Sequence, residues 1–500
     1  MLFNWLSHAL LLTVVLDLRR KVCKPRFFVQ GLLMMCKTIV FALIAMAAVA
    51  CADNNSNQTD LNQSTGPYAG LTPLLSGNIP LEVPLPPADI IDDPVLSRPF
   101  FDTFSWQSFI ALSWPADATN RGIPIEPNSP EKFRQTNTTV GSSAPVVWET
   151  YREGFELFPR NNSVPPEWNS ADPVQTPAGE ISADRVLAMV TKGGAVGQQN
   201  EAFSGPLIDQ NRNYARFEVR INQIEYDQVR NNRWYDKAAI DAAIADTVAA
   251  QISAGITAPQ GIQFDTNSLE IKAAWRELTD QDDETRYYVR DALIANEDGY
   301  NYTIARMGLV GLHIMQKTAA FPQWIWSTFE QVDNVSGPHP SFNNGTAAPP
   351  SLLANDEPVG YNYEPTGIDA PFPTRETREP VQVTRAVPIP TTPNNPSGYS
   401  TQELNQQYRA LLKGTVWENY QLIVTQWPLD SSLPSPYNPQ FNPENYDDTF
   451  AGDPFPDYAA NVTMETYFQK NSSCIECHYH AAAYGVDYSW ILFDRVINTQ

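Results

Sequence analysis

Residues 302–318 read Tyr-Thr-Ile-Ala-Arg-Met-Gly-Leu-Val-Gly-Leu-His-Ile-Met-Gln-Lys-Thr. This segment predicts a β-strand. Because a strand turns alternate side chains to the same side, one face would carry Met307, Leu309, Gly311, His313 and Met315. Gly311 has no side chain and would let a flat group approach the backbone closely. The segment is therefore both a structural element and a candidate wall of a site.

Further elements surround this strand. Strands are also expected at 185–191, 215–226, 269–278, 286–295, 416–427 and 488–493. Helices are expected at 101–114, 237–254, 401–413 and 457–469, the third capped by Ser400 or Thr401. No regular β-α-β alternation links them, so the sequence predicts an α+β fold. We expect a mainly antiparallel β core with several peripheral helices and long Pro/Asn-rich loops.

The N-terminal 98 residues divide into a leader and a linker. Residues 38–50 are apolar, follow Lys37 and are too short for a bilayer, so 1–50 predicts a signal peptide. Translation from Met34 or Met35 is an alternative, because residues 1–33 are unusual for such a peptide. Residues 51–98 have the Asn, Gln, Ser and Pro composition of a flexible tether. One folded domain is expected over 99–500, with a long loop at 335–400.

The leader ends in Ala48-Val-Ala-Cys51, which is similar to a bacterial lipobox. In such a motif the cysteine is lipidated and becomes the mature N-terminus, so Cys51 is the expected lipidation site. The alternative is cleavage after Ala50 by ordinary signal peptidase. Ala52, in place of the Asp that retains lipoproteins in the inner membrane, favours an outer-membrane lipoprotein facing the periplasm.

The net charge and the positions of the cysteines limit the classes of partner and cofactor that the chain can bind. The formal net charge of −23 argues against nucleic acid and against charge-driven binding to anionic lipid. The five cysteines are Cys23, Cys36, Cys51, Cys474 and Cys477. Because the first three belong to the leader and the processing site, only the last pair remains in the folded part.

That pair belongs to the motif Cys474-Ile-Glu-Cys-His478. C-x-x-C-H is the attachment signature of c-type haem, in which each thiol adds across a vinyl group to form a thioether. Cys474 and Cys477 are thus expected to bind one haem c covalently, and His478 to ligate its iron. A redox dithiol does not require the histidine. Half of a zinc site would need a second cysteine pair that the chain lacks.

The position of the motif excludes the small all-α cytochrome c fold, which carries C-x-x-C-H near its start and takes a Met ligand from downstream. Here 22 residues follow His478, and none is Met. His480 is too near His478 to reach the opposite side of a haem. A sixth iron ligand must therefore come from upstream. The candidates are His313, His339, Met189, Met307, Met315 and Met464.

We expect His313 to be the sixth ligand, with Met315 as the alternative; an open sixth position is the third reading. Both residues are equally consistent with ordinary core packing. Trp324, Trp326 and Phe329 would pack on the haem and exclude water, or would be core residues.

Five segments resemble a group of large bacterial monohaem c-type cytochromes, many of them expected to be lipoproteins. The segments are Trp106–Pro115, Leu269–Glu277, Gly311–Thr318, Pro322–Gln331 and Thr463–Gln469, and the likeness spans roughly residues 100–490. The resemblance implies haem attachment at Cys474, Cys477 and His478. It implies no substrate and no sixth ligand.

The favoured function is therefore an exported monohaem cytochrome that transfers electrons in the periplasm or cell envelope to a redox partner protein. The alternative is a peroxidase- or oxygenase-like haem enzyme, or a ligand sensor, with an open sixth iron position. The size of the folded region supports the alternative. No distal acid–base pair can be named in the sequence, which supports electron transfer over catalysis.

Overall fold

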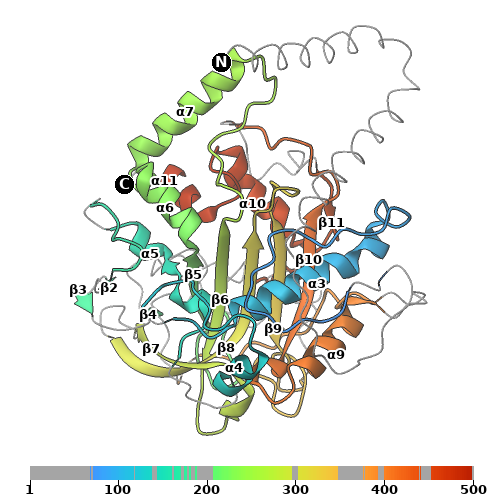
Figure 1. Ribbon diagram of the computed structural model, residues 1–500. Coiled ribbons are helices and arrows are strands. Elements are labelled where there is room, and N and C mark those ends of the chain that lie inside the picture. The colour runs from blue at the N-terminus through green and yellow to red at the C-terminus, as the bar shows by residue number, and fades with distance from the viewer. Residues whose placement is uncertain are drawn as a thin grey trace. The chain divides into compact units, whose positions relative to one another are not determined.

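The computed structural model describes residues 68, 71–117, 119–137, 144–159, 163–170, 174–176, 179–181, 186–187, 206–295, 302–346, 376, 378–391, 399–438, 440 and 452–497. These residues form a mixed structure of helices around a mainly antiparallel sheet (Figure 1). The predicted α+β class is confirmed, and the small all-helical fold is excluded. Within the described residues, no helix has the length and apolar character that crossing a membrane requires.

One sheet organises the described chain. Its strand order is β1-β5-β6-β8-β9-β10-β11, with β7 paired to β8 and β4 paired to β7. Only the short β4–β7 pair is parallel among the strand pairs described. The strands of this sheet are β1 Arg152–Glu153, β4 Val186–Leu187, β5 Arg216–Ile221, β6 Leu269–Glu277, β7 Val289–Ala295, β8 Tyr302–Gln316, β9 Ile325–Gln331, β10 Tyr420–Pro428 and β11 Pro454–Phe455. A separate hairpin joins β2 Val174–Thr176 to β3 Gly179–Ile181.

The strand expected at 302–318 is the centre of this sheet, as β8. Its first half pairs with β7 and its second half with β6 and β9. In its second half, β8 is therefore hydrogen-bonded on both edges, and almost every residue there is buried.

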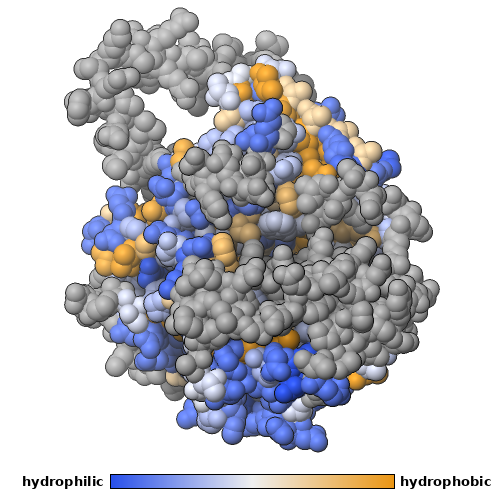
Figure 2. Space-filling model, turned by 180° about the vertical axis from the view of Figure 1, so that it is seen from behind, coloured by the Kyte–Doolittle hydropathy of each residue, from blue (hydrophilic) through white to orange (hydrophobic). Residues whose placement is uncertain are grey.

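The α-helices surround the sheet (Figure 1). They are α3 Pro94–Leu112, α4 Pro130–Thr136, α5 Gly154–Leu157, α6 Gln223–Asn231, α7 Lys237–Ser253, α9 Thr401–Leu411, α10 Cys474–Ala483 and α11 Trp490–Ile497. In α9, Ser400 is the capping residue, one of the two that the sequence suggested, and it forms a reciprocal capping pair with Glu403. Helix α7 buries only Ile240 and Ile244, so its apolar residues are visible on the surface (Figure 2).

Helices α3 and α10 lie on opposite faces of the sheet. The Ser105 hydroxyl of α3 is 2.7 Å from the hydroxyls of Ser327 in β9 and Thr425 in β10. Gln426, the residue after Thr425, contacts the first turn of α10. Because neighbouring strand residues point to opposite faces, the C-x-x-C-H motif at the start of α10 lies on the face away from α3.

Several expected elements differ in the structure. The strand expected over 215–226 ends at Ile221, because Asn222 caps α6. The helix expected over 457–469 is absent; only Gln469–Asn471 forms a single 3-10 turn there. The strand expected over 488–493 is instead the beginning of α11. Residues 71–93, assigned by composition to the linker, include the buried side chains of Leu71, Leu75 and Ile90. The folded part thus begins before residue 99.

Asp102 of α3 gives a pH-dependent prediction. Burial raises its pKa to about 6, although the hydroxyls of Thr401 and Thr425 donate hydrogen bonds to it. Between about pH 4 and pH 6 the folded state therefore binds more protons than the unfolded state, and this group lowers stability as pH rises. We expect Asp102→Asn to stabilise the fold by about 1–3 kcal/mol at neutral pH and by much less near pH 4, where the carboxyl is protonated in the folded state. Urea unfolding at both pH values measures this; a gain that does not grow with pH contradicts it.

Candidate haem site

The C-x-x-C-H motif forms the first turns of α10. Ser473 caps this helix, accepting a hydrogen bond from the backbone N–H of Glu476. Gln426 of β10 accepts one from the backbone N–H of Ile475 at 3.0 Å and donates to the Ser473 hydroxyl. The sheet therefore fixes the position of the helix N-terminus.

The helix brings the three predicted haem-binding residues together. Cys477 and His478 are three and four residues after Cys474, so all three side chains lie on one side of α10. Each of them is half-buried. Two thiols and an imidazole on one helical face are the arrangement that double thioether attachment and axial ligation require.

The imidazole of His478 is held in a defined tautomer. Its Nδ1 lies 2.7 Å from the backbone carbonyl oxygen of Tyr488. Because a carbonyl only accepts, Nδ1 carries the proton and donates it, and Nε2 is left with the lone pair. A ligating histidine commonly uses its other ring nitrogen in this way. The residues present therefore fit a haem bound through Nε2 of His478.

Two tryptophans pack around the His478 ring. The Trp326 ring centroid of β9 is 4.4 Å away, and that of Trp490 in α11 is 6.1 Å away with its plane nearly perpendicular. Trp326 is almost fully buried and donates its indole N–H to the carbonyl of Gln323. Both rings restrict the orientation of the imidazole and its contact with water.

Met315 lies beside this cluster. In the sheet register it pairs with Trp326, which pairs in turn with Gln426. Directly paired residues point to the same face, so Met315 lies on the face that carries α10. The structure thus places the alternative sixth ligand next to the tryptophan that contacts His478.

His313 lies one residue pair further along the same face, paired with Thr328. Its Nε2 is 3.5 Å from a carboxylate oxygen of Glu465, which also accepts the backbone N–H of Asn461. The segment 461–465 therefore covers His313.

The other candidates lie elsewhere. Met307 is buried at the opposite end of β8, and Met464 is buried in a separate hydrophobic cluster with Val462 and Tyr467. His339 is exposed in a turn after β9. His480 is half-buried, and burial lowers its pKa. Met189 and Cys51 lie outside the described residues.

The sequence identified Trp326 as a candidate for the site, but not Gln426, Trp490, Tyr488 or Asp487. Tyr488 acts through its backbone carbonyl, which leaves no signature in a side chain. Gln426 is recognisable only from the strand register. The role of Asp487 depends on its long-range contacts with Phe264, Lys317 and Trp324.

Comparison with known proteins adds no relative: no family model, no curated protein and no solved structure matches this chain.

Proposed function

We propose that this protein is an exported monohaem c-type cytochrome that transfers electrons in the bacterial cell envelope. The observation that carries the proposal is the hydrogen bond from His478 Nδ1 to the Tyr488 carbonyl, within a C-x-x-C-H helix. A histidine prepared as an Nε2 ligand, one residue after a cysteine pair on the same helical face, suits covalent haem better than a redox dithiol.

Cys474 and Cys477 would hold the haem by thioether bonds, and His478 would bind its iron. The bound group supplies one-electron exchange at iron. The surrounding residues orient the ligand, shield it and hold the helix in place. The Tyr488 carbonyl orients the imidazole, Trp326 and Trp490 shield it, and Gln426 anchors the helix.

The cellular setting is part of the same proposal. Residues 1–50 direct export, and lipidated Cys51 attaches the protein to the outer membrane, with the haem domain in the periplasm. The electron donor or acceptor is a protein partner reached there. The net charge of −23 is compatible with a partner that has a basic surface.

The optical spectrum of the purified holoprotein tests the electron-transfer function. We expect a low-spin, six-coordinate haem in both oxidation states, unchanged by carbon monoxide or cyanide, because a carrier needs no open iron position. A high-spin haem that binds these ligands readily contradicts electron transfer and favours the enzyme or sensor alternative.

Two further variants identify the sixth ligand in the same experiment. His313→Ala should convert the haem to high spin if His313 binds iron, whereas Met315→Leu should leave the spectrum unchanged. The reverse result assigns Met315, which is the neighbour of Trp326. If neither variant changes the spectrum, neither residue ligates the iron.

A further inference from the structure

The carbonyl that orients His478 belongs to a turn between α10 and α11 that is bound tightly to the segment before β6. The backbone N–H of Ile262 donates to the carbonyl of Gly485 at 2.9 Å. A Cβ on Gly261 would overlap that same carbonyl oxygen, so the two backbones are in direct contact. The haem helix is thus fixed at its end as well as at its start.

Asp487 is the centre of this turn. It is 1% exposed and has a φ of 55°, a left-handed conformation that L residues rarely adopt. Its carboxylate accepts the backbone N–H of Phe264 at 3.0 Å and the indole N–H of Trp324 at 3.3 Å. Lys317 donates to it at 2.6 Å and is itself 5% exposed. These contacts offset the unfavourable backbone conformation.

Lys317 is equally well anchored. Its backbone N–H donates to the carbonyl of Ser268, next to the first residue of β6. The ion pair therefore connects the end of the central strand β8 to the residue that precedes Tyr488. Moving either charge would move the Tyr488 carbonyl relative to His478.

We propose that the Lys317–Asp487 ion pair is a positioning device for the axial histidine and thereby sets the reduction potential of the iron. This inference rests on the proposed haem function. A short Nδ1–H···O=C bond increases the electron donation from Nε2 to the metal. Because greater donation stabilises oxidised iron, loosening the bond raises the potential.

A purely electrostatic role and a positioning role predict opposite changes in the reduction potential when Lys317 is replaced. If the pair acts only by its charges, removing Asp487 raises the potential and removing Lys317 lowers it, because a nearby cation favours the reduced state. If the pair acts by positioning, removing either partner weakens the Nδ1 hydrogen bond and raises the potential.

The test uses the holoprotein with Asp487→Asn and Lys317→Met, measured by redox titration. Asn also tolerates a positive φ, so the first variant keeps the turn. We expect both variants to have a higher reduction potential than the wild type. Lys317→Arg, which keeps the charge, should have a potential close to the wild-type value. The ring N–H resonance of His478 in the oxidised protein should exchange faster with solvent in both variants.

The matched control is Asp209→Asn. Asp209 is also a fully buried carboxylate in an ion pair, but its partner Arg276 lies at the opposite end of β6. We expect no change in potential there. Asp487 also interacts with the buried carboxyls of Glu225 and Glu270, and burial raises the pKa of both, that of Glu270 to about 7. All variants are therefore titrated at the same pH, well below 7.

Opposite shifts in Asp487→Asn and Lys317→Met overturn the inference in favour of charge alone. Unchanged potentials, or an equal shift in Asp209→Asn, also overturn it. All of these results leave the haem proposal intact. A wild-type protein without covalent haem would instead remove the proposed function.

Discussion

Replacing Cys474 and Cys477 together by serine is expected to abolish covalently bound haem. The two thiols provide the only thioether bonds that the C-x-x-C-H motif supplies, and they lie on one side of α10 with His478. Serine preserves the size and the helix but forms no thioether. The measurement is haem-dependent peroxidase staining of denatured protein, after expression in a host that matures c-type cytochromes. Staining of the double variant at wild-type strength contradicts the assignment.

His478 and His480 provide a matched pair for the same experiment. Both are half-buried in α10, two residues apart, but only His478 lies four residues after Cys474. His478→Ala should keep the haem attached while making it high spin, because the thioethers remain and the axial nitrogen is lost. His480→Ala should leave both attachment and spin state unchanged. Equal effects of the two substitutions would contradict the role assigned to His478.

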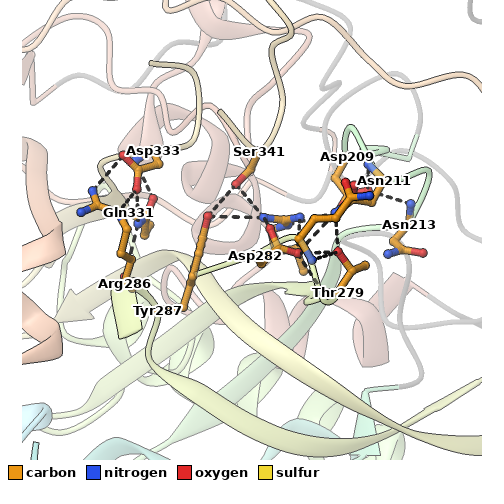
Figure 3. Close-up of polar contacts among 12 residues, drawn as sticks. Asp209, Asn211, Asn213, Thr279, Asp282, Arg286, Tyr287, Gln331, Asp333 and Ser341 are labelled. Atoms are coloured by element: carbon orange, nitrogen blue, oxygen red, sulfur yellow. Dashed lines mark hydrogen bonds and ion pairs between the residues drawn. The ribbon is translucent and has the colours of Figure 1, made fainter. Parts of the chain in front are cut away.

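Replacing Arg276 by alanine is expected to cost about 3–5 kcal/mol of folding stability, because it removes the cation that pairs with the fully buried Asp209 and the partly buried Asp282. Arg276 is 2% exposed. It donates to Asp209 at 3.1 Å and to both oxygens of Asp282, at 2.8 and 3.2 Å. The same guanidinium contacts the hydroxyls of Tyr287 and Ser341. Figure 3 shows Tyr287 and Ser341 beside Asp282, with Asp209 nearby.

The effect of Arg276→Ala should depend on pH. Burial raises the pKa of Asp209 to about 6 even with Arg276 present. Without the guanidinium that pKa rises further, so the uncompensated charge is present above it and is removed by protonation as pH falls. The loss of stability should therefore be larger near pH 8 than near pH 5, as measured by urea unfolding.

Arg306→Ala is the control for this variant. Arg306 pairs with Glu284 and Asp291, but its side chain is 32% exposed and that of Asp291 is 63% exposed. Exposed ion pairs contribute about 0–1 kcal/mol, so this substitution should be nearly neutral. Comparable losses in Arg276→Ala and Arg306→Ala would show that the buried cluster does not stabilise the fold as described.

The sequence predicted those elements whose pattern is local. Strand β8 contains a long, mostly apolar segment, and α9 begins at a capping residue that short-range rules recognise. Strand β9 was missed because Ile325–Gln331 is short and mixes apolar with polar residues without alternation, although every one of them is buried. A strand buried on both faces is recognisable only through its neighbours in the sheet.

The prediction of a helix over 457–469 was wrong for a different reason. The Asn461 side chain donates to the Phe329 carbonyl and accepts the backbone N–H of Thr463. The backbone N–H of Val462 donates to Glu330. These side-chain contacts replace helical hydrogen bonds and hold the segment against β9. They are long-range contacts, which a local pattern does not contain.

In the candidate site, too, local features were predictable from the sequence and long-range contacts were not. The motif and its ligand order were predictable because attachment chemistry demands fixed spacing within one turn of helix. The Tyr488 carbonyl and the Lys317–Asp487 pair were not, because they depend on how the chain returns after α10.

The mass of the intact wild-type protein, measured after denaturation and removal of non-covalent ligands, tests the central claim most directly. We expect the mass of the processed chain plus one haem, with the added mass on the tryptic peptide that contains Cys474 and Cys477. An unmodified mass for that peptide, in protein matured by a host that attaches haem c, would contradict it.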